Sequence, residues 1–256
     1  MPRRKIYDAY AGDFSATLRR SREEALTLLK NIAGEYESRG FRGILPSFSL
    51  RKCTREAVRS LLAFVKLVEE AAAHTSLEIY PRCHIATEDV EALRCLLARI
   101  RPLCVLVSVE LSSRSVAAFS CRDRRVDLLT IIPGVSPRIL RGDAMYAAER
   151  SKFFEITLSH LLGASAREVA QRLAFCRPYV EFLARKELPL LVSTGPRIEF
   201  LAASYRALLA FAKEVLGYPA DFAARAMGPL LKAKIQENVE KIAGLRPREG
   251  VYIEQA

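Results

Sequence analysis

The strongest constraint on the fold is a repeating alternation of short apolar runs with longer amphipathic stretches. Residues 103–109 (LCVLVSV) are almost wholly apolar and have no alternating polar face. Such a strand is buried on both sides, as in a parallel sheet covered by helices. Strands are expected at residues 5–11, 42–45, 77–86, 103–109, 126–132, 153–158 and 189–193.

The stretches between these runs begin like helices. Ser21-x-x-Glu24 and Ser165-x-x-Glu168 have the pattern of capping boxes, in which side chain and backbone satisfy each other's amides. Helices are expected at residues 21–38, from 54, at 87–100, 113–120 and 144–150, from 165, and at 198–216, 221–227 and 229–243, with Gly217 and Gly244 as C-terminal stops.

Seven strand–helix units over about 250 residues have the size and rhythm of a TIM-like α/β barrel. The last helices are expected to close the gap left by a missing eighth strand, and a doubly wound open sheet is the alternative. No linker divides residues 1–256, so we expect a single barrel domain. The residues expected to be buried in strands include Val105, Val107, Leu129, Ile131, Ile156 and Leu191.

Composition narrows the class of protein. The chain has 256 residues, of which 50% are hydrophobic, and this excludes a disordered, collagen-like or small disulfide-scaffold protein. No apolar run approaches the roughly 20 residues that span a bilayer. The basic start at residues 3–5 is followed by Asp8 and Asp13, unlike a signal peptide, so we expect a cytoplasmic protein with no membrane partner.

The six cysteines show neither a C-x-x-C pair nor zinc-ligand spacing. Most lie in apolar runs, so we expect buried free thiols that pack as small hydrophobic side chains. Disulfides would be expected only in the cytosol of a hyperthermophile.

The net charge of +11 favours a polyanionic partner, although an arginine-rich genome would give the same count. Several arginines fall in or next to expected loops that flank the strands, which suits an extended phosphate-contacting surface. The RNA-binding candidates are Arg114, Arg122, Arg124, Arg125, Arg138, Arg141, Arg197 and Arg206.

Catalytic chemistry is hard to find in the sequence. His74, His84 and His160 are scattered without metal-ligand spacing, so no metal, cofactor or catalytic residue is expected. Ser193-Thr194-Gly195 would suit either a phosphate-binding turn or a simple tight turn. A metal-dependent phosphoesterase, the alternative function, would use Asp8, His84, His160 and Ser193; a general RNA-binding or assembly protein is a third possibility.

Four segments in fixed order resemble the ribonuclease P protein component 3 family, the archaeal relatives of the human thirty-kilodalton ribonuclease P subunit. They are residues 123–129 (DRRVDLL), 144–148 (AMYAA), 154–159 (FEITLS) and 191–195 (LVSTG).

The resemblance implies a seven-stranded TIM-like barrel related to the polymerase-and-histidinol-phosphatase metal enzymes. It also implies a subunit of the ribonucleoprotein that removes the 5′ leader of precursor tRNA, in which the RNA carries the chemistry. The implied partners are ribonuclease P RNA, the RRM-like protein component 2 and other protein subunits, with indirect contact to precursor tRNA. The metal enzymes begin with Asp-x-His, where this chain has Asp8-Ala9-Tyr10.

Overall fold

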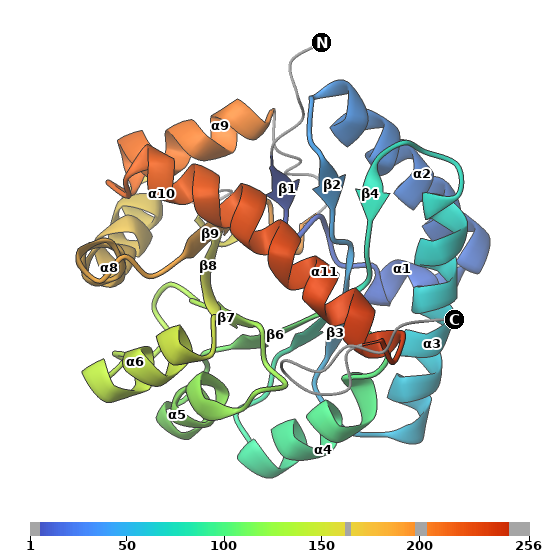
Figure 1. Ribbon diagram of the computed structural model, residues 1–256, viewed down its shortest axis with the longest axis horizontal. Helices are drawn as coiled ribbons and strands as arrows, with labels where there is room; N and C mark the ends of the chain where they lie inside the picture. The colour runs from blue at the N-terminus through green and yellow to red at the C-terminus, as the bar shows by residue number, and fades with distance from the viewer. Residues whose placement is uncertain (1–5, 162–164, 198–203, 246–256) are drawn as a thin grey trace.

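The computed structural model describes residues 6–161, 165–197 and 204–245, and its parallel strands form a ring surrounded by helices (Figure 1). One ladder has the order β3-β5-β6-β7-β8-β9 and the other β1-β2-β4. The strands are β1 (Tyr7–Asp8), β2 (Gly43–Ile44), β3 (Ser47–Leu50), β4 (Glu78–Ile79), β5 (Arg82–Ile85), β6 (Leu106–Glu110), β7 (Leu128–Thr130), β8 (Phe153–Thr157) and β9 (Leu190–Ser193).

Helices follow most of the strands and cover the outside of the ring. Among the described residues, no helix combines the length and apolar character needed to cross a membrane. The α-helices are α1 (Ser15–Arg20), α2 (Arg22–Ser38), α3 (Arg55–Ala72), α4 (Val90–Ile100), α5 (Arg114–Arg122), α6 (Arg141–Glu149), α7 (Leu158–Leu161), α8 (Ala166–Arg185), α9 (Tyr205–Ala210), α10 (Ala220–Arg225) and α11 (Leu231–Ile242), with π-helical turns η2 (Phe211–Val215) and η3 (Ala226–Leu230).

Two prolines divide the barrel wall into two hydrogen-bonded ladders. Pro46 separates β2 from β3 and Pro81 separates β4 from β5, because proline has no N–H to donate. Backbone hydrogen bonds continue across the break, from Arg82 to Pro46 O at 3.0 Å and from Tyr80 to Ile44 O at 3.2 Å. The strand expected at 42–45 therefore resumes after Pro46 as β3, and the strand expected at 77–86 is interrupted at Pro81. Counting β2 with β3 and β4 with β5, the wall has the seven strands that the sequence predicts.

The wall closes into a barrel, so the open-sheet alternative is wrong. After β9, the Gly195 amide donates to Tyr10 O at 2.8 Å and the Gly12 amide donates to Gly195 O at 3.1 Å. The turn η3 contacts both β9 and β1, as expected for helices that close the missing-strand gap. Helix α11 crosses one end of the barrel (Figure 1), where Asn238 Nδ2 donates to Val105 O at 2.9 Å, just before β6. This is the end from which the strands start, so α11 covers the amino end.

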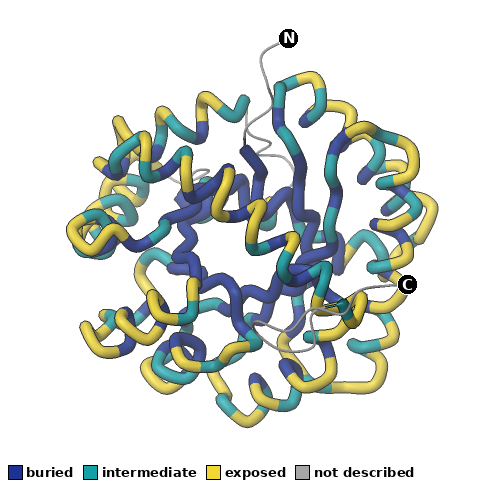
Figure 2. The backbone as a smooth tube through the Cα atoms, in the orientation of Figure 1, coloured by how far each residue is buried: buried dark blue, intermediate teal, exposed yellow. Residues whose placement is uncertain are grey.

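Burial follows the sequence pattern closely. The six residues expected to be buried are all buried, with Val105 the most exposed at 7%. The backbone of the ring is dark blue in Figure 2, whereas the outer helix faces are exposed. Val105 and Ile131 lie just outside β6 and β7, which are shorter than the apolar runs that contain them.

Several helix boundaries differ from those expected. Helix α4 starts at Val90 because Asp89, and not Thr87, caps it by accepting bonds from the Glu91 and Ala92 amides. Helix α9 starts after the extended cap Ser204, and the expected start at 198 lies outside the described residues. Helices α1 and α7 were not expected.

Near the C-terminus the expected break at Pro229 does not occur. The chain stays helical from α10 through η3 to α11, because the wide π-turn accommodates the missing N–H of Pro229. Gly217 and Gly244 do end helical segments, with φ of +71° and +76°. Ser165 and Glu168 form the full reciprocal capping box, while at α2 Ser21 accepts a bond from the Glu24 amide.

The expectation of free thiols is wrong for four cysteines. Cys53 in the β3–α3 connection is bonded to Cys95 in α4, and Cys83 in β5 is bonded to Cys104 before β6. Cys121 and Cys176 are buried free thiols, as expected. Neither disulfide has a short sequence motif, because the bonded cysteines are 42 and 21 residues apart.

Alkylation without reduction should therefore label two thiols in the denatured protein, at Cys121 and Cys176, and six after reduction. Replacing Cys53 and Cys95 by Ser should lower the free energy of unfolding by roughly 3–4 kcal/mol, because the disulfide restricts the unfolded chain. Mass spectrometry and guanidinium denaturation measure the two effects. Six labelled thiols before reduction would contradict the pairing.

Candidate functional site

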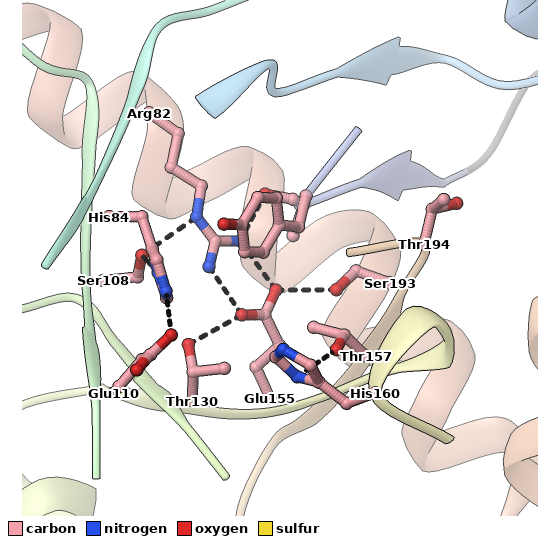
Figure 3. A network of polar contacts seen from close by, with 12 residues as sticks. Arg82, His84, Ser108, Glu110, Thr130, Glu155, Thr157, His160, Ser193 and Thr194 are labelled. Atoms are coloured by element: carbon pink, nitrogen blue, oxygen red, sulfur yellow. Dashed lines mark hydrogen bonds and ion pairs between the residues drawn. The ribbon is translucent and has the colours of Figure 1, made fainter. Parts of the chain in front are cut away.

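A charged pair occupies the interior of the barrel (Figure 3). Arg82 on β5 and Glu155 on β8 are both fully buried. The guanidinium forms two hydrogen bonds to the carboxylate, at 2.7 and 2.6 Å. Successive side chains of a strand point to opposite faces of the wall. The residues next to Arg82 and Glu155 face the outer helices, so Arg82 and Glu155 themselves point into the barrel.

Neighbouring strands satisfy the remaining hydrogen-bonding groups of the pair. Thr130 on β7 and Ser193 on β9 each donate a hydroxyl to Glu155 at 2.8 Å. Arg82 donates from Nε to Ser108 on β6 at 3.0 Å and from a terminal nitrogen to the Ala9 carbonyl after β1. The pair therefore links most of the wall through its inner face.

The electrostatics of the pair favour its charged form. Burial alone would raise the pKa of Glu155, but the Arg82 charge and the hydrogen bonds to the carboxylate hold that pKa below its usual range. The Tyr10 ring lies over the guanidinium, with 4.1 Å between Arg82 Cζ and the ring centre. Tyr10 thus occupies the space in front of the buried charge.

Asp8, a candidate residue of the phosphoesterase alternative, serves the structure. It is fully buried and accepts hydrogen bonds from the Tyr36 hydroxyl at 2.7 Å and from the amides of Tyr10 and Thr194 at 3.1 Å. Burial raises the pKa of Asp8, against the opposing effect of these bonds. Ser193 is likewise buried and bonded to Glu155.

A cleft of about 730 Å³ opens above this network, at the carboxyl end of the strands. Its wall includes residues from the ends of β3, β5 and β6 and from α1, α3 and α7. Barrel enzymes place their sites at this end. The residues lining the cleft that carry charge or an imidazole are Asp13, Arg19, Arg51, Lys52, Glu56, His84, Glu110 and His160.

Two histidines reach the cleft, as the phosphoesterase alternative would need. His84 bonds through Nδ1 to Ser108 at 2.8 Å and through Nε2 to Glu110 at 2.9 Å. Burial would raise the pKa of Glu110, but His84 lowers it overall. His160 bonds through Nδ1 to Thr157 at 2.7 Å, and burial lowers its pKa.

These donors do not fit a metal centre. Both nitrogens of His84 are engaged, and the Asp8 carboxylate accepts hydrogen bonds from Tyr36 and Thr194. Within the described ranges, no three His, Cys, Asp or Glu residues are grouped so as to hold a metal ion.

The cleft rim contains cations that the sequence reasoning missed. Arg51 and Lys52 directly follow β3, are exposed, and form no ion pair with any described residue. Arg19 on α1 is also exposed and donates from Nε to the Ser15 carbonyl at 2.9 Å. Arg51 and Lys52 could have been found in the sequence by extending the strand beyond Pro46, because this extension places both residues at the end of a strand.

The eight arginines singled out in the sequence do not form one surface. Four follow β6, β7 or β9 and lie toward the carboxyl end; these are Arg114, Arg138, Arg141 and Arg197. Arg206 in α9 lies near the α2–β2 turn at the amino end, because the ring of the adjacent Tyr205 approaches Gly40.

The other three lie at or after the end of α5. Arg124 and Arg125 occupy the turn before β7, at the amino end, and Arg125 is bonded to Asp123 at 2.7 Å. Arg122, in the last turn of α5, is bonded to Asp143 of α6 at 2.9 Å. These ion pairs engage Arg122 and Arg125 within the protein.

Comparison with known proteins decides the family. A family model described as RNase P subunit p30 matches residues 15–239. The chain belongs to this family. The match starts at α1 and reaches into α11, so it includes the buried pair and all the residues that line the cleft except Tyr10 and Asp13.

Two relatives agree with this family. Ribonuclease P protein component 3 of Methanopyrus kandleri is 29% identical over 124 residues, which is 48% of this chain and 51% of the relative. The chain thus spans about half the length of this curated relative. A chain in a cryo-EM structure of archaeal ribonuclease P with mature tRNA superimposes with a TM-score of 0.54 at 21% identity, covering 82% of this chain and 89% of that one. The superposition agrees with the barrel described above.

Replacing Glu155 by Gln should lower the free energy of unfolding by roughly 3–5 kcal/mol, because it leaves the buried Arg82 charge uncompensated. The double change Arg82→Met and Glu155→Leu should cost less than the single one, since it removes both charges. Urea denaturation of the three proteins tests this. Glu181→Gln is the matched control, because the Glu181–Arg177 pair is exposed and such pairs contribute at most about 1 kcal/mol. Equal losses in Glu155→Gln and Glu181→Gln would contradict the role of the buried pair.

Proposed function

We propose that this protein is a subunit of ribonuclease P, the ribonucleoprotein that removes the 5′ leader of precursor tRNA. The observation that carries the proposal is the match of the RNase P subunit p30 family over residues 15–239. The relatives agree with it, since one is named as a ribonuclease P protein and the other belongs to a ribonuclease P structure.

The subunit supports the catalytic RNA and does not carry the chemistry itself. In favour of this, the polar groups inside the barrel bond to one another, and Tyr10 covers the buried charge. Asp8 and Ser193 lie below the cleft surface with their polar atoms engaged. A reacting group would have to break these bonds before it met a substrate.

The proposed partners are ribonuclease P RNA, the RRM-like protein component 2 and other protein subunits, with indirect contact to precursor tRNA. Residues 1–256 act as one barrel unit in this complex, in the cytoplasm. The net charge of +11 supports an RNA partner, because it attracts the phosphate backbone.

RNA contacts the carboxyl end of the barrel, around the cleft rim. Arg51 and Lys52 support this choice, because they are exposed and form no close ion pair with a described residue, although the Arg51 charge lowers the pKa of Glu110 across the cleft. Arg114 at the start of α5 and Arg197 after β9 are further candidate contacts at this end, whereas Arg206 lies near the α2–β2 turn at the amino end. Arg124, at the other end, would belong to a separate RNA contact. Arg122 and Arg125 would reach RNA only by giving up their acidic partners.

Changing both Arg51 and Lys52 to Ala should weaken binding of ribonuclease P RNA and lower the slope of log affinity against log salt. The expected decrease in slope is roughly 0.7–0.9 for each lost phosphate contact, through reduced counterion release. An unrelated structured RNA should lose a similar fraction of its affinity, because phosphates carry no sequence information. A salt series of binding measurements on both RNAs gives the slopes.

Arg99→Ala is the control, since Arg99 is exposed in the last turn of α4, toward the amino end. Arg124→Ala tests the separate contact. If only Arg124→Ala reduces the slope, the RNA face is at the amino end. Failure of the parent protein to stimulate precursor-tRNA cleavage by the RNA and the remaining subunits would falsify the proposed function.

A further inference from the structure

Exposed apolar side chains gather on one segment of the outer surface, between β7 and the middle of α6. Four of the eight large hydrophobic side chains recorded as exposed among the described residues belong to residues 135–146. The other four are distributed singly over α3, η2, η3 and α11. Isolated exposed hydrophobic residues are ordinary, whereas a cluster marks an interaction site. We name this cluster the α6 patch; its members are Val135 (54% exposed), Leu140 (49%), Met145 (54%) and Tyr146 (46%).

The α6 patch is held in place by contacts on each side. The Tyr179 hydroxyl of α8 donates to the Ser136 carbonyl at 2.7 Å, and the Arg114 guanidinium donates to the Arg138 carbonyl at 3.0 Å. The β7–α6 connection is therefore fixed by neighbouring helices, yet its apolar side chains stay on the outside. A surface ordered before binding loses little conformational entropy when a partner docks.

Helix α6 presents Tyr146 as an oriented anchor. Arg122 from α5 lies 5.2 Å from the centre of the Tyr146 ring, and Asp143 of α6 holds the guanidinium at 2.9 Å. Helices α5 and α6 lie side by side on the outside of the barrel (Figure 1), and Figure 2 shows the outer side of α6 exposed. Tyr and Arg are the residue types that dominate binding energy at protein interfaces.

A groove on the neighbouring α4–α5 surface extends the α6 patch. It measures about 500 Å³, and its lining includes Phe119, Arg94 and Arg122. Arg94 lies 5.2 Å from the centre of the Phe119 ring. Arg122 borders both the groove and Tyr146, so the groove and the α6 patch form one continuous surface.

The border of the α6 patch carries two exposed arginines and one exposed acid, Glu149, which lies one helical turn beyond Met145. Arg138 and Arg141 stand on either side of Leu140, both exposed, and neither forms an ion pair with a described residue. The nearby Asp143 is buried and engaged by Arg122. A partner that meets this border favourably carries Asp or Glu there.

We propose that the α6 patch and the adjoining groove dock a protein subunit that has an apolar centre bordered by acidic residues. An apolar centre with arginine at its rim is the composition of a protein–protein interface. RNA is the less suitable occupant, because its phosphates gain nothing from burial against Val135, Leu140 and Met145. The proposal rests on the proposed function, which supplies the multisubunit complex, and it assigns Arg138 and Arg141 to protein rather than RNA contact.

Site-specific photocrosslinking tests the occupant directly. Tyr146 is replaced by p-benzoylphenylalanine, and the complex is reconstituted with ribonuclease P RNA and the remaining protein subunits of the same genome. The expected product is a crosslink to one protein subunit, at a peptide that contains Asp or Glu near apolar residues. The same photoreactive residue at Leu62, an isolated exposed position on α3, should not yield that product. A crosslink to RNA, a crosslink to a second copy of this chain, or no crosslink would each overturn the proposal.

Two substitutions test how much the apolar centre and the basic border contribute to the affinity for the crosslinked subunit. Met145→Asp should weaken binding of the crosslinked subunit at least tenfold, because it places a charge in the apolar centre. Arg141→Glu should weaken binding most at low salt, because it reverses a charge that faces acidic residues. Circular dichroism melting is the control for folding, and both variants should melt like the parent since both positions are exposed. Unchanged affinity in both variants overturns the docking site. Stimulation of cleavage by the parent protein in the same complex shows separately whether the proposed function stands.

Discussion

A charge buried inside a barrel destabilises the fold unless it is neutralised and hydrogen-bonded. Arg82 and Glu155 meet this condition by pairing across the interior, with donors and acceptors from β1, β6, β7 and β9 completing the network. The pair helps to fix the register of β5 and β8, because a one-residue slip of either strand would turn a charged side chain toward the apolar helix layer.

The two ends of the barrel differ. At the amino end, α11 covers the strand starts and donates through Asn238 to Val105 O and Asp127. At the carboxyl end the cleft stays open and has cations at its rim. The outer side near α6 is the third distinct region, apolar where the cleft rim is charged. The cleft rim and the α6 patch are thus two surfaces of different composition, the first lined by charged side chains and the second apolar with an arginine border.

The sequence predicted those parts of the fold that depend on local apolar pattern. The run at 103–109 could only be a strand buried on both sides, and the structure places it there as β6. Arg82 and Glu155 were missed because a charged residue in a strand normally indicates a solvent-facing position, and their partnership joins residues 73 positions apart. The two disulfides were missed for the same reason.

The sequence predicted the positions of the candidate arginines only in part. Their positions beside strands were read correctly, but a sequence does not show that a helix returns the chain to the other end of the barrel. Arg114 and Arg124 therefore bracket α5 and lie toward opposite ends. Arg51 and Lys52 were missed because the strand expected at 42–45 resumes after Pro46 as β3, which ends at Leu50.

The two disulfides also have a consequence for the integrity of the chain. Their loops overlap, because Cys83 lies inside the segment closed by Cys53 and Cys95, while Cys104 lies beyond it. A single proteolytic cut anywhere between Cys53 and Cys104 therefore leaves the two fragments covalently joined. The stretch from the β3–α3 connection through α4 to the start of β6 can therefore be cut once without releasing a piece of the barrel, until a reductant opens the disulfides.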